Sequence, residues 1–502
     1  MEWAPRTTGT SRGRGRSMPG GMTPPSTPAV IVASEDEDSS FDASEYRQVT
    51  YGPPTHYCDP AKTTNGAGTF GDPWQPSQAM SAAVAGNVVG WIAGVTASMA
   101  RSTDTQTPTL NPANSGTSGS RIVHVTRYAA VALDTPPSNA LRTQLRHDGV
   151  GVVSDGPSSE SGNGASMFGS LSRNYITWDG FYVDIDEAEI ASDTGCISIR
   201  ECTGVHVRNF YIKSKELTCN SNAVVYRPNN CIGTVLHNGV IENHTNVPPG
   251  TQAGIASDQY ADQGYLIEYI TVRDSDVGFY TKGAPGGVFN YGTMQYLKLH
   301  GMDIGLVSHA WDTNPANLQI FHHCLIYDYL SVGFIIGTNH PTAENVLVHH
   351  LTVANGTATG GGALGPIYIR TATTAFANFT IRDSIFDWAN ASAGRAVEGG
   401  DYDGTTFPTM DYNRYYRVGA GVTWTMDVST LTTIAQWRTA LGGGSQESHS
   451  DTLGSDPFTS RASDDYTIAA GSSALLTADS SGGELGCFEG SIEPGHYGSY
   501  GF

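Results

Sequence analysis

An internal repeat is the feature that most constrains how this chain can fold. The template apolar-x-apolar-x-x-apolar-x-apolar recurs with copies that start at Ile176, Val205, Thr234, Tyr265, Gly292, Gln319, Val346 and Phe379. Their start positions step by 29, 29, 31, 27, 27, 27 and 33 residues. A second motif, apolar-Gly-apolar, begins at Val277, Ile304 and Val332 and keeps nearly the same step. Two motifs that share one period are typical of a solenoid in which each repeat forms one coil.

Each copy of the template predicts two short strands that turn one apolar face inward, because side chains alternate along a strand. Between the two strands lie polar pairs such as Asp179-Gly180, His237-Asn238 and His349-His350. Gly and Asn tolerate the left-handed backbone that a sharp corner needs. Stacking such coils about 4.8 Å apart would bury their apolar faces. A β-sandwich is the alternative, but it would show many two-residue Asn-Gly turns.

The composition supports an all-β chain. Of its 502 residues, 39% are hydrophobic and 15% charged, and there are 60 Gly and 25 Pro. Long runs of helix-forming residues are missing, which excludes a helical bundle or coiled coil. Aromatic residues at 10% are too many for a disordered chain. The one short helix that we expect lies within residues 76–86.

Charge and cysteine usage exclude several partners. The net charge of −21 repels phosphate, so we expect no nucleic acid partner. An acidic polysaccharide would also be repelled, unless a metal ion or a local basic patch intervenes. No run of 18 apolar residues is present, so we expect no membrane insertion. The seven cysteines show no paired spacing, so we expect no zinc site and mostly buried thiols.

Segments near both ends of the chain carry a family resemblance. Thr55-His56-Tyr57-Cys58-Asp59-Pro60, Asp72-Pro73-Trp74 and the expected helix resemble the entry cap of right-handed parallel β-helix proteins. Asp411-Tyr412-Asn413-Arg414, Ile434-Ala435-Gln436-Trp437 and Asp456-Pro457-Phe458 resemble their closing segment. The resemblance covers about residues 55–490 and implies the pectate-lyase-like fold. This superfamily includes polysaccharide lyases, glycoside hydrolases, epimerases, viral tailspikes and non-catalytic surface proteins.

We therefore predict a right-handed parallel β-helix of about 27–30 residues per coil with a short N-terminal capping helix. A flexible arm spans residues 1–46, the entry cap and first coils 47–120, the body 121–400, and the closing coils and tail 401–502. The arm has Arg6, Arg12, Arg14 and Arg16 ahead of an acidic run at residues 35–38, and it lacks the apolar segment of a secretory signal. Arms of this composition can become ordered on a partner, so we expect it to dock on other virion proteins.

A column of candidate catalytic residues follows from the repeat register. Five residues after the starts of the second strand motif, successive coils present Lys282, His309 and Gly337, and the register places Asp258 in the same column one coil earlier. Stacked about 5 Å apart, an acid, a lysine and a histidine could transfer the proton that a lyase removes. Trp311, Asp312, Asn339 and His340 are the binding candidates, with the indole as a platform for a sugar ring. The alternative is that all seven are solvated turn residues.

Other clusters have simpler explanations. Asp258 with Glu268, or Asp274 with Asp276, could form the carboxylate pair of a glycoside hydrolase, and the second pair reads equally as a turn. His322 with His349, and His323 with His350, fall at equivalent positions, so we expect them to stack at a corner. We predict no cofactor and no metal site, with Ca²⁺ held by acidic turns as the alternative.

Three functions remain open at this stage. The first is a virion structural protein, either a tailspike or a capsid-surface spike, which meets host-surface glycan. The resemblance to solenoid spikes then implies a homotrimer on the virion surface with the arm as anchor. The second is an extracellular polysaccharide-degrading enzyme, a lyase rather than a glycoside hydrolase. The third is an inert adhesive or surface-layer solenoid.

Overall fold

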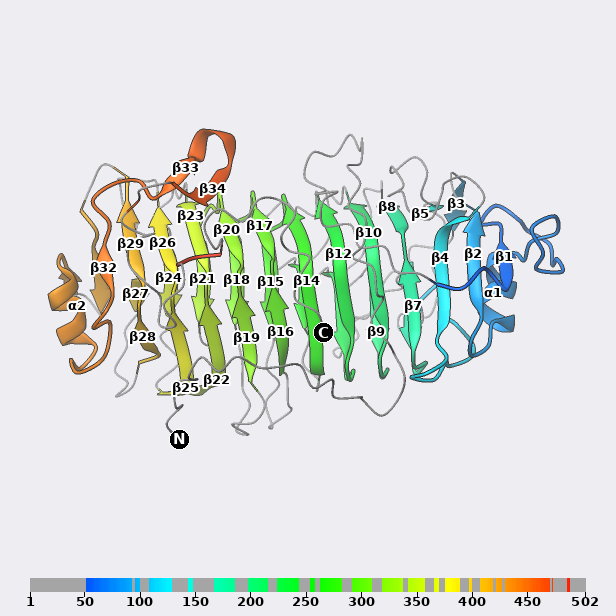
Figure 1. Ribbon diagram of the computed structural model, residues 1–502, viewed down its shortest axis with the longest axis horizontal. Helices are drawn as coiled ribbons and strands as arrows, with labels where there is room; N and C mark the ends of the chain where they lie inside the picture. The colour runs from blue at the N-terminus through cyan, green and yellow to red at the C-terminus, as the bar shows by residue number, and fades with distance from the viewer. Residues whose placement is uncertain are drawn as a thin grey trace, which may run out of the picture.

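The structure is a computed structural model, and the account below concerns the residues that it describes. These are residues 51–92, 95–99, 108–128, 143–147, 167–185, 197–214, 224–242, 253–257, 262–281, 291–308, 318–336, 342–356, 365–369, 375–388, 397–399, 407–418, 421–426, 429–469, 472 and 485–487. Figure 1 shows an elongated solenoid in which parallel strands cross the long axis one coil after another. The predicted parallel β-helix is therefore confirmed.

The described strands follow three lines that run the length of the solenoid. The first line contains β1 (His56–Cys58), β2 (Val88–Ile92), β4 (Ile122–Tyr128), β7 (Ile176–Asp179), the first parts of β10 (His206–Ser214), β12 (Val235–Glu242) and β14 (Gln263–Arg273), then β16 (Tyr291–Gln295), β19 (Gln319–His322), β22 (Thr342–His349), β25 (Ala375–Arg382) and β28 (Thr409–Asp411). The second line contains β3 (Thr96–Met99), β5 (Thr143–His147), β8 (Phe181–Ile185), the second parts of β10, β12 and β14, then β17 (Lys298–His300), β20 (Leu325–Tyr327), β23 (Thr352–Gly356), β26 (Ile385–Trp388), β29 (Arg414–Arg417) and β32 (Asp451–Thr452).

The third line forms a separate 11-stranded sheet. It contains β6 (Phe168–Leu171), β9 (Ile197–Arg200), β11 (Val224–Asn229), β13 (Ala253–Ser257), β15 (Val277–Thr281), β18 (Ile304–Ser308), β21 (Val332–Ile336), β24 (Gly365–Ile369), β27 (Val397–Gly399), β30 (Trp424–Met426) and the antiparallel β31 (Ser429–Leu431). The apolar-Gly-apolar motif begins β15, β18 and β21. A side-chain carbon at Gly278 would lie only 2.6 Å from the Gly305 carbonyl oxygen and 2.7 Å from Met302 Sδ. The motif therefore needs glycine because the next coil lies too close for a larger residue.

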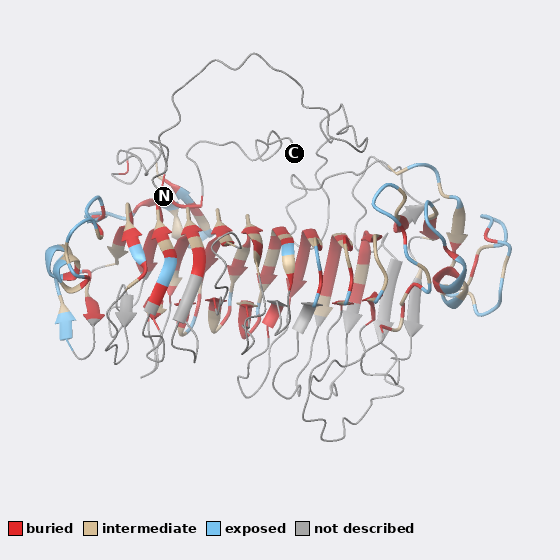
Figure 2. Cartoon of the chain, turned by 90° about the horizontal axis from the view of Figure 1, so that it is seen from below, coloured by how far each residue is buried: buried red, intermediate tan, exposed pale blue. Residues whose placement is uncertain are grey.

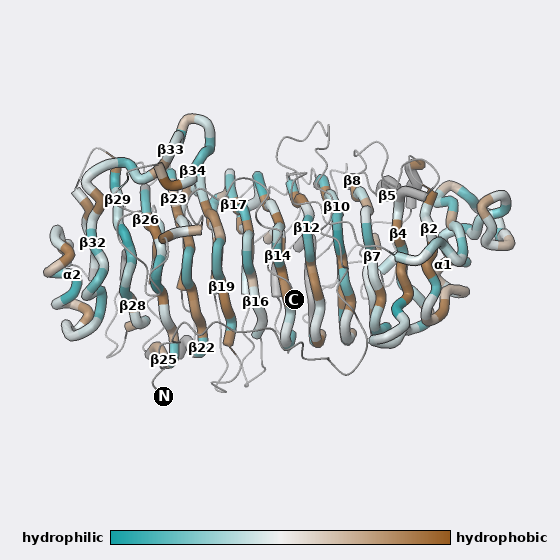
Figure 3. Tube along the Cα trace, in the orientation of Figure 1, coloured by the Kyte–Doolittle hydropathy of each residue, from teal (hydrophilic) through white to brown (hydrophobic). Residues whose placement is uncertain are grey.

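The apolar positions of the repeat template form the core. Ile176, Trp178, Phe181 and Val183 of the first copy are at most 1% exposed. The same positions pair in parallel register from coil to coil, as in Val207 with Leu236 and Ile212 with Ile241. Buried positions run along the strands in Figure 2, and the same strands carry the hydrophobic segments of Figure 3. Each buried aliphatic side chain contributes about 1.5–3 kcal/mol, so stacking of coils supplies most of the stability.

The corner between the first and second lines is left-handed and lies at the predicted polar pairs, although residues other than Gly and Asn also adopt this backbone there. Asn209 and Asn238 adopt positive φ there, and Asn238 Nδ2 donates to Asn209 Oδ1 at 2.9 Å. Farther along, the equivalent corner residues are aromatic, and Tyr269 and His323 have φ of 57° and 53°. Aromatic residues at positive φ are uncommon. Here ring stacking across coils offsets the backbone strain, with 4.8 Å between the rings of Tyr269 and Tyr296.

Short helices lie at the two ends of the solenoid (Figure 1). The predicted N-terminal helix is present as α1 (Pro76–Ala82), and it ends before residue 86 because Ala83 has extended backbone. At the other end, α2 (Ile434–Ala440) begins with a capping box formed by Thr433 and Gln436, and it buries Trp437. No helix among the described residues has the length and apolar character to cross a membrane. The five described cysteines are buried and free of disulfides.

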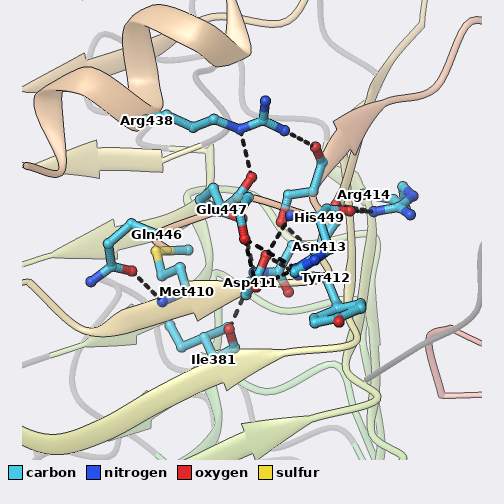
Figure 4. A network of polar contacts seen from close by, with 12 residues as sticks. Ile381, Met410, Asp411, Tyr412, Asn413, Arg414, Arg438, Gln446, Glu447 and His449 are labelled. Atoms are coloured by element: carbon cyan, nitrogen blue, oxygen red, sulfur yellow. Dashed lines mark hydrogen bonds and ion pairs between the residues drawn. The ribbon is translucent and has the colours of Figure 1, made fainter. Parts of the chain in front are cut away.

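A buried carboxylate organises the C-terminal end, where the Asp411-Tyr412-Asn413-Arg414 motif resembles a closing segment. Figure 4 shows the network around Glu447. This fully buried carboxylate accepts hydrogen bonds from the Tyr415 hydroxyl and from Trp437 Nε1, and Arg438 Nε donates to its backbone oxygen at 2.6 Å. Burial raises the pKa of Glu447 above its usual value. Since protein groups satisfy the carboxylate, we interpret this network as structural.

Candidate functional site

The predicted catalytic and binding residues lie outside the described residues. These are Asp258, Lys282, His309, Trp311, Asp312, Asn339 and His340. The strands that lead to the predicted column are in the expected register, since Ser257 pairs with Thr281 and Ser308 pairs with Ile336. The strand residues directly before the column are therefore aligned from coil to coil. The position and the role of the column residues themselves stay predictions.

The outer face of the third line is apolar just before that column. Tyr280, Val307, Ile335 and Tyr368 pair in register on neighbouring coils. They belong to a hydrophobic cluster that is separate from the main core and in which Val307 and Ile335 are 2% and 4% exposed. The sequence analysis did not anticipate this apolar strip beside the column.

A polar site with described side chains lies on the outer face of the second line. It comprises Tyr182, Tyr211, Lys213, Glu242, Arg273, Lys298 and His300 on β8, β10, β12, β14 and β17, and we call it the tyrosine–cation patch. Its members face outward because the residues between them, such as Ile212, Ile241 and Val272, belong to the core. Lys213, Glu242, Arg273 and His300 pair in register and form one column with one residue per coil. The patch therefore runs parallel to the long axis of the solenoid.

One carboxylate holds two cations in this column. Arg273 Nε donates to Glu242 Oε2 at 2.8 Å, Lys213 Nζ lies 3.4 Å from Glu242 Oε1, and the Tyr211 hydroxyl donates to the same carboxylate. The Glu242 side chain is 5% exposed, whereas the Lys213 and Arg273 side chains are 32% and 19% exposed. With Lys298 added, the patch has three cations for one buried carboxylate. Its described charged side chains therefore include more cations than carboxylates on a protein of net charge −21, and Asp184 is the next residue in register beside Lys213.

Aromatic rings flank these cations. Tyr182 and Tyr211 stack with ring centroids 5.1 Å apart and an angle of 6° between the rings. His300 stacks on Tyr327 at 4.6 Å, and Lys298 Nζ lies 5.6 Å from the centre of the same tyrosine ring. Burial raises the pKa of Tyr327 well above its ordinary value, so this phenol stays neutral. Tyr182 is only partly buried, and its ring could pack against the apolar face of a sugar.

The patch brings together cations and the imidazole of His300, whose Nε2 is buried. Cations can neutralise the carboxylate of the sugar, which makes the neighbouring C–H proton easier to remove, and an imidazole can accept that proton. The same contacts have a purely structural explanation. Lys213, Glu242 and Arg273 alternate in charge along the register, and such pairs add up to about 1 kcal/mol each to coil stacking.

The histidine prediction at the corner is confirmed. His322 stacks on His349 at 5.1 Å and His323 stacks on His350 at 4.8 Å. Burial lowers the pKa of His322 to about 4 and that of His323 to about 3, so both imidazoles are neutral at pH 7. No cluster of three His, Cys, Asp or Glu residues with metal-binding geometry occurs within the described ranges. This corner is a stacked ladder, as expected.

The structure describes both members of only one of the two predicted carboxylate pairs. Asp258 of the first pair lies outside the described residues, while Glu268 accepts hydrogen bonds from Gln295 Nε2 and shares one with His237 Nδ1 at 2.9 Å. Asp274 and Asp276 occupy the short connection between β14 and β15, where Asp274 has a φ of 56°. This confirms the interpretation of the second pair as turn residues.

Sequence reasoning missed the tyrosine–cation patch, although its pattern was present. Lys213, Glu242, Arg273 and His300 each follow the last apolar residue of one template copy. Aligning the copies therefore aligns these four residues as well. The third-line column was followed in the sequence, and the positions next to the template were not.

Comparisons with known proteins give fold similarity. No protein-family model and no curated protein matches the sequence. Among solved structures, a rhamnogalacturonan lyase matches with a TM-score of 0.49 and 13% identity over 88% of this chain and 96% of that chain. The pectate lyase Pel9A matches with a TM-score of 0.42 and 13% identity over 87% of this chain and 96% of that chain. At such low identity the likeness concerns the fold alone.

Proposed function

We propose that this protein is a polysaccharide lyase that binds an acidic polysaccharide along the tyrosine–cation patch. The observation that carries the proposal is the excess of cations in the patch. A chain of net charge −21 repels a polyanion, so a ligand of that kind needs a local positive surface. Lys213, Arg273 and Lys298 supply that surface, and Tyr182, which stacks on the buried Tyr211, supplies a ring for a sugar to pack against.

In the proposed reaction, a base takes the proton on the carbon next to the uronate carboxylate. The electron pair left behind forms a double bond to the neighbouring ring carbon. The bond between that carbon and the glycosidic oxygen breaks. The leaving oxygen then receives a proton. Cations at the carboxylate stabilise the negative charge that develops there in the transition state. His300 is the group in the patch that can accept the first proton, and the predicted Lys282 and His309 are its rivals.

The test is a screen of uronate and neutral polysaccharides for unsaturated sugar ends, read by ultraviolet absorbance, with reducing ends measured in parallel. We expect absorbance to rise on a uronate polymer. His300→Gln should lower kcat by at least about 100-fold. Lys62→Gln is the matched control, since Lys62 lies in the entry cap and its partner Asp72 has a side chain that is 54% exposed. Reducing ends without absorbance would mean hydrolysis, and no turnover of any polymer would contradict the proposal.

The same assay separates the candidate base in the patch from those in the third-line column. Lys282→Ala and His309→Ala are measured beside His300→Gln on the polymer that is cleaved. If only the two column variants lose turnover, the acid–base group belongs to the third-line column and the patch is left with binding alone. If both column variants keep full turnover, that column is retired.

The virion-spike prediction is the second candidate, and it rests on the arm at residues 1–46, which lies outside the described residues. We propose docking of that arm on other virion proteins, a homotrimer and a virion-surface location on that basis only. Deleting residues 1–45 tests the docking, because the truncated protein should no longer join particles. Mass by light scattering tests the trimer. A spike of this type could also degrade the glycan that it meets.

A further inference from the structure

We infer that the C-terminal hairpin closes one end of the tyrosine–cation patch, so that the site takes the end of a polysaccharide chain. The hairpin consists of β33 (Phe458–Ser460), η3 (Arg461–Ser463) and β34 (Asp465–Ile468). The inference rests on the proposed function, since it concerns how the same patch binds the same polymer. It adds a preference for chain ends and a structural element that sets this preference.

The hairpin packs on the same outer face that carries the patch, a few coils farther along. Phe458, Tyr466 and Ile468 form a cluster with residues of the second line. Among these, Leu325 and Tyr327 of β20 are 4% and 2% exposed, and Ile385 of β26 is fully buried. Figure 1 shows the hairpin beside β20 and β23. The face therefore changes from polar and partly exposed to apolar and covered.

Polar contacts hold the hairpin in place. Arg461 pairs with Asp387 of β26 and forms hydrogen bonds to Asp456, with 2.9 Å between Arg461 Nη2 and Asp456 Oδ1. A second C-terminal segment lies on the same coils, since the Cys487 amide donates to Thr352 Oγ1 and the Gly486 amide donates to the Asp383 carbonyl, each at 3.0 Å. The covering is thus fixed to β23, to β26 and to Asp383 in the corner between β25 and β26.

Tyr327 marks the border between the patch and the hairpin. On one side its ring stacks on His300 at 4.6 Å, and on the other side it lies 4.8 Å from the ring of Tyr466. Lys298, the last cation of the patch, sits on the coil directly before Tyr327. A polymer that follows the cations runs along the solenoid axis, because the cations repeat from coil to coil. Such a polymer meets Tyr466 directly after Lys298, and its chain must end there.

The measurement is the size distribution of products against time, from a long and a short preparation of the same uronate polymer at equal mass. We expect small products of fixed length from the first time points, and a rate that scales with the number of chain ends. Early products of all lengths with a steep fall in viscosity would overturn the inference, while leaving the lyase proposal intact.

Binding provides an independent test that needs no turnover. If the patch takes chain ends, the number of protein molecules bound per polymer chain should stay constant as the chain is lengthened. A number that rises in proportion to length would overturn the inference. Absence of cleavage together with constant stoichiometry would contradict the lyase proposal and support chain-end recognition.

Variants of the hairpin test whether it sets the preference for chain ends. Tyr466→Ala removes the ring at the border, and we expect product lengths to broaden at least several-fold while turnover persists. Thr459→Ala is the control, since Thr459 is exposed on the same hairpin and its hydroxyl donates to the Thr467 carbonyl. If the product profile of Tyr466→Ala matches those of Thr459→Ala and the parent protein, the hairpin does not set the chain-end preference.

Discussion

The outer face of the second line has two halves with the same backbone arrangement. One half carries polar, partly exposed side chains, and the other carries apolar side chains that the C-terminal hairpin covers. At β10, β12, β14 and β17 the outward positions include Lys213, Glu242, Arg273 and Lys298, and the three cations stay partly exposed. On later coils the position of Lys298 is taken by Leu325 and Ile385, and that of Arg273 by Tyr327 and Ala354. All four belong to the cluster that the C-terminal hairpin covers. The inward residues are apolar throughout. A parallel β-helix can therefore keep one core and assign its outer face coil by coil, either to its own chain or to a ligand.

The largest expected effect comes from the anchor of the covered half. Arg461→Ala leaves Asp387 buried without its charged partner, and removing one member of a buried ion pair costs about 3–5 kcal/mol. We expect protease cleavage within residues 453–469 to become fast, measured on the full chain. Replacing both residues by Arg461→Met and Asp387→Leu should recover most of that protection. Equal protection in Arg461→Ala and the parent protein would contradict the role of this anchor.

A second pair of variants compares adjacent coils at one position of the column. Leu325 and Lys298 pair in register, yet the leucine is under the hairpin and the lysine is on the patch. Leu325→Ala should lower the free energy of unfolding by about 2–4 kcal/mol through lost burial and a cavity. Lys298→Ala should stay within about 0.5 kcal/mol. Urea unfolding of both variants measures the difference. Equal decreases in the free energy of unfolding would contradict the division of this face into a covered and an exposed half.

Lowering the pH should change the stability contributed by the corner and by the covered half in opposite directions. Burial lowers the pKa of His323 to about 3, so between pH 6.5 and pH 3 the unfolded chain binds a proton that the folded chain does not. Stability at the corner thus falls as pH falls, by about 1–2 kcal/mol at pH 5 for this residue. Burial raises the pKa of Asp387 to about 6, so its folded carboxyl gains a proton first and stability there rises between pH 6 and pH 4.

The histidine contribution can be isolated by substitution. Asparagine adopts the left-handed corner backbone readily, so His323→Asn should keep the fold and reduce the loss of stability between pH 7 and pH 5. Urea unfolding at the two pH values checks this for the variant and the parent. The control is Gln436→Ala, a change in the exposed capping box of α2 that involves no group titrating in this range. If His323→Asn loses as much stability between pH 7 and pH 5 as the parent protein, His323 does not cause the acid sensitivity.

The fold was predictable because the repeat is local and periodic. Template residues such as Trp178 and Ile212 recur at one spacing, and stacking in register follows from that spacing. The corner was predictable only in part, since Tyr269 and His323 adopt a backbone conformation that we expected of Gly and Asn. The hairpin over Leu325 was not predictable, because it depends on contacts between residues more than 100 positions apart with no shared motif.

The site was harder to predict than the fold. The patch depends on residues beside the template, such as Lys213 and Arg273, whose proximity becomes clear only when the coils are aligned. The proposed base and the cations come from different coils, so no short motif contains them. The predicted column of Lys282 and His309 follows strands whose register is confirmed, and its chemistry stays a prediction.

The most direct test of the central claim is binding of a uronate polymer at two salt concentrations. The variant is Lys213→Gln with Lys298→Gln, which leaves Arg273 to hold Glu242 and so keeps the buried carboxylate paired. The control is Lys62→Gln in the entry cap, where the partner of the lysine is the exposed Asp72. We expect the double variant to bind at least about 10-fold more weakly than the control and to depend less on salt, because two exposed cations are gone. Equal affinity and equal salt dependence in the variant and the control would contradict a polysaccharide site on this patch.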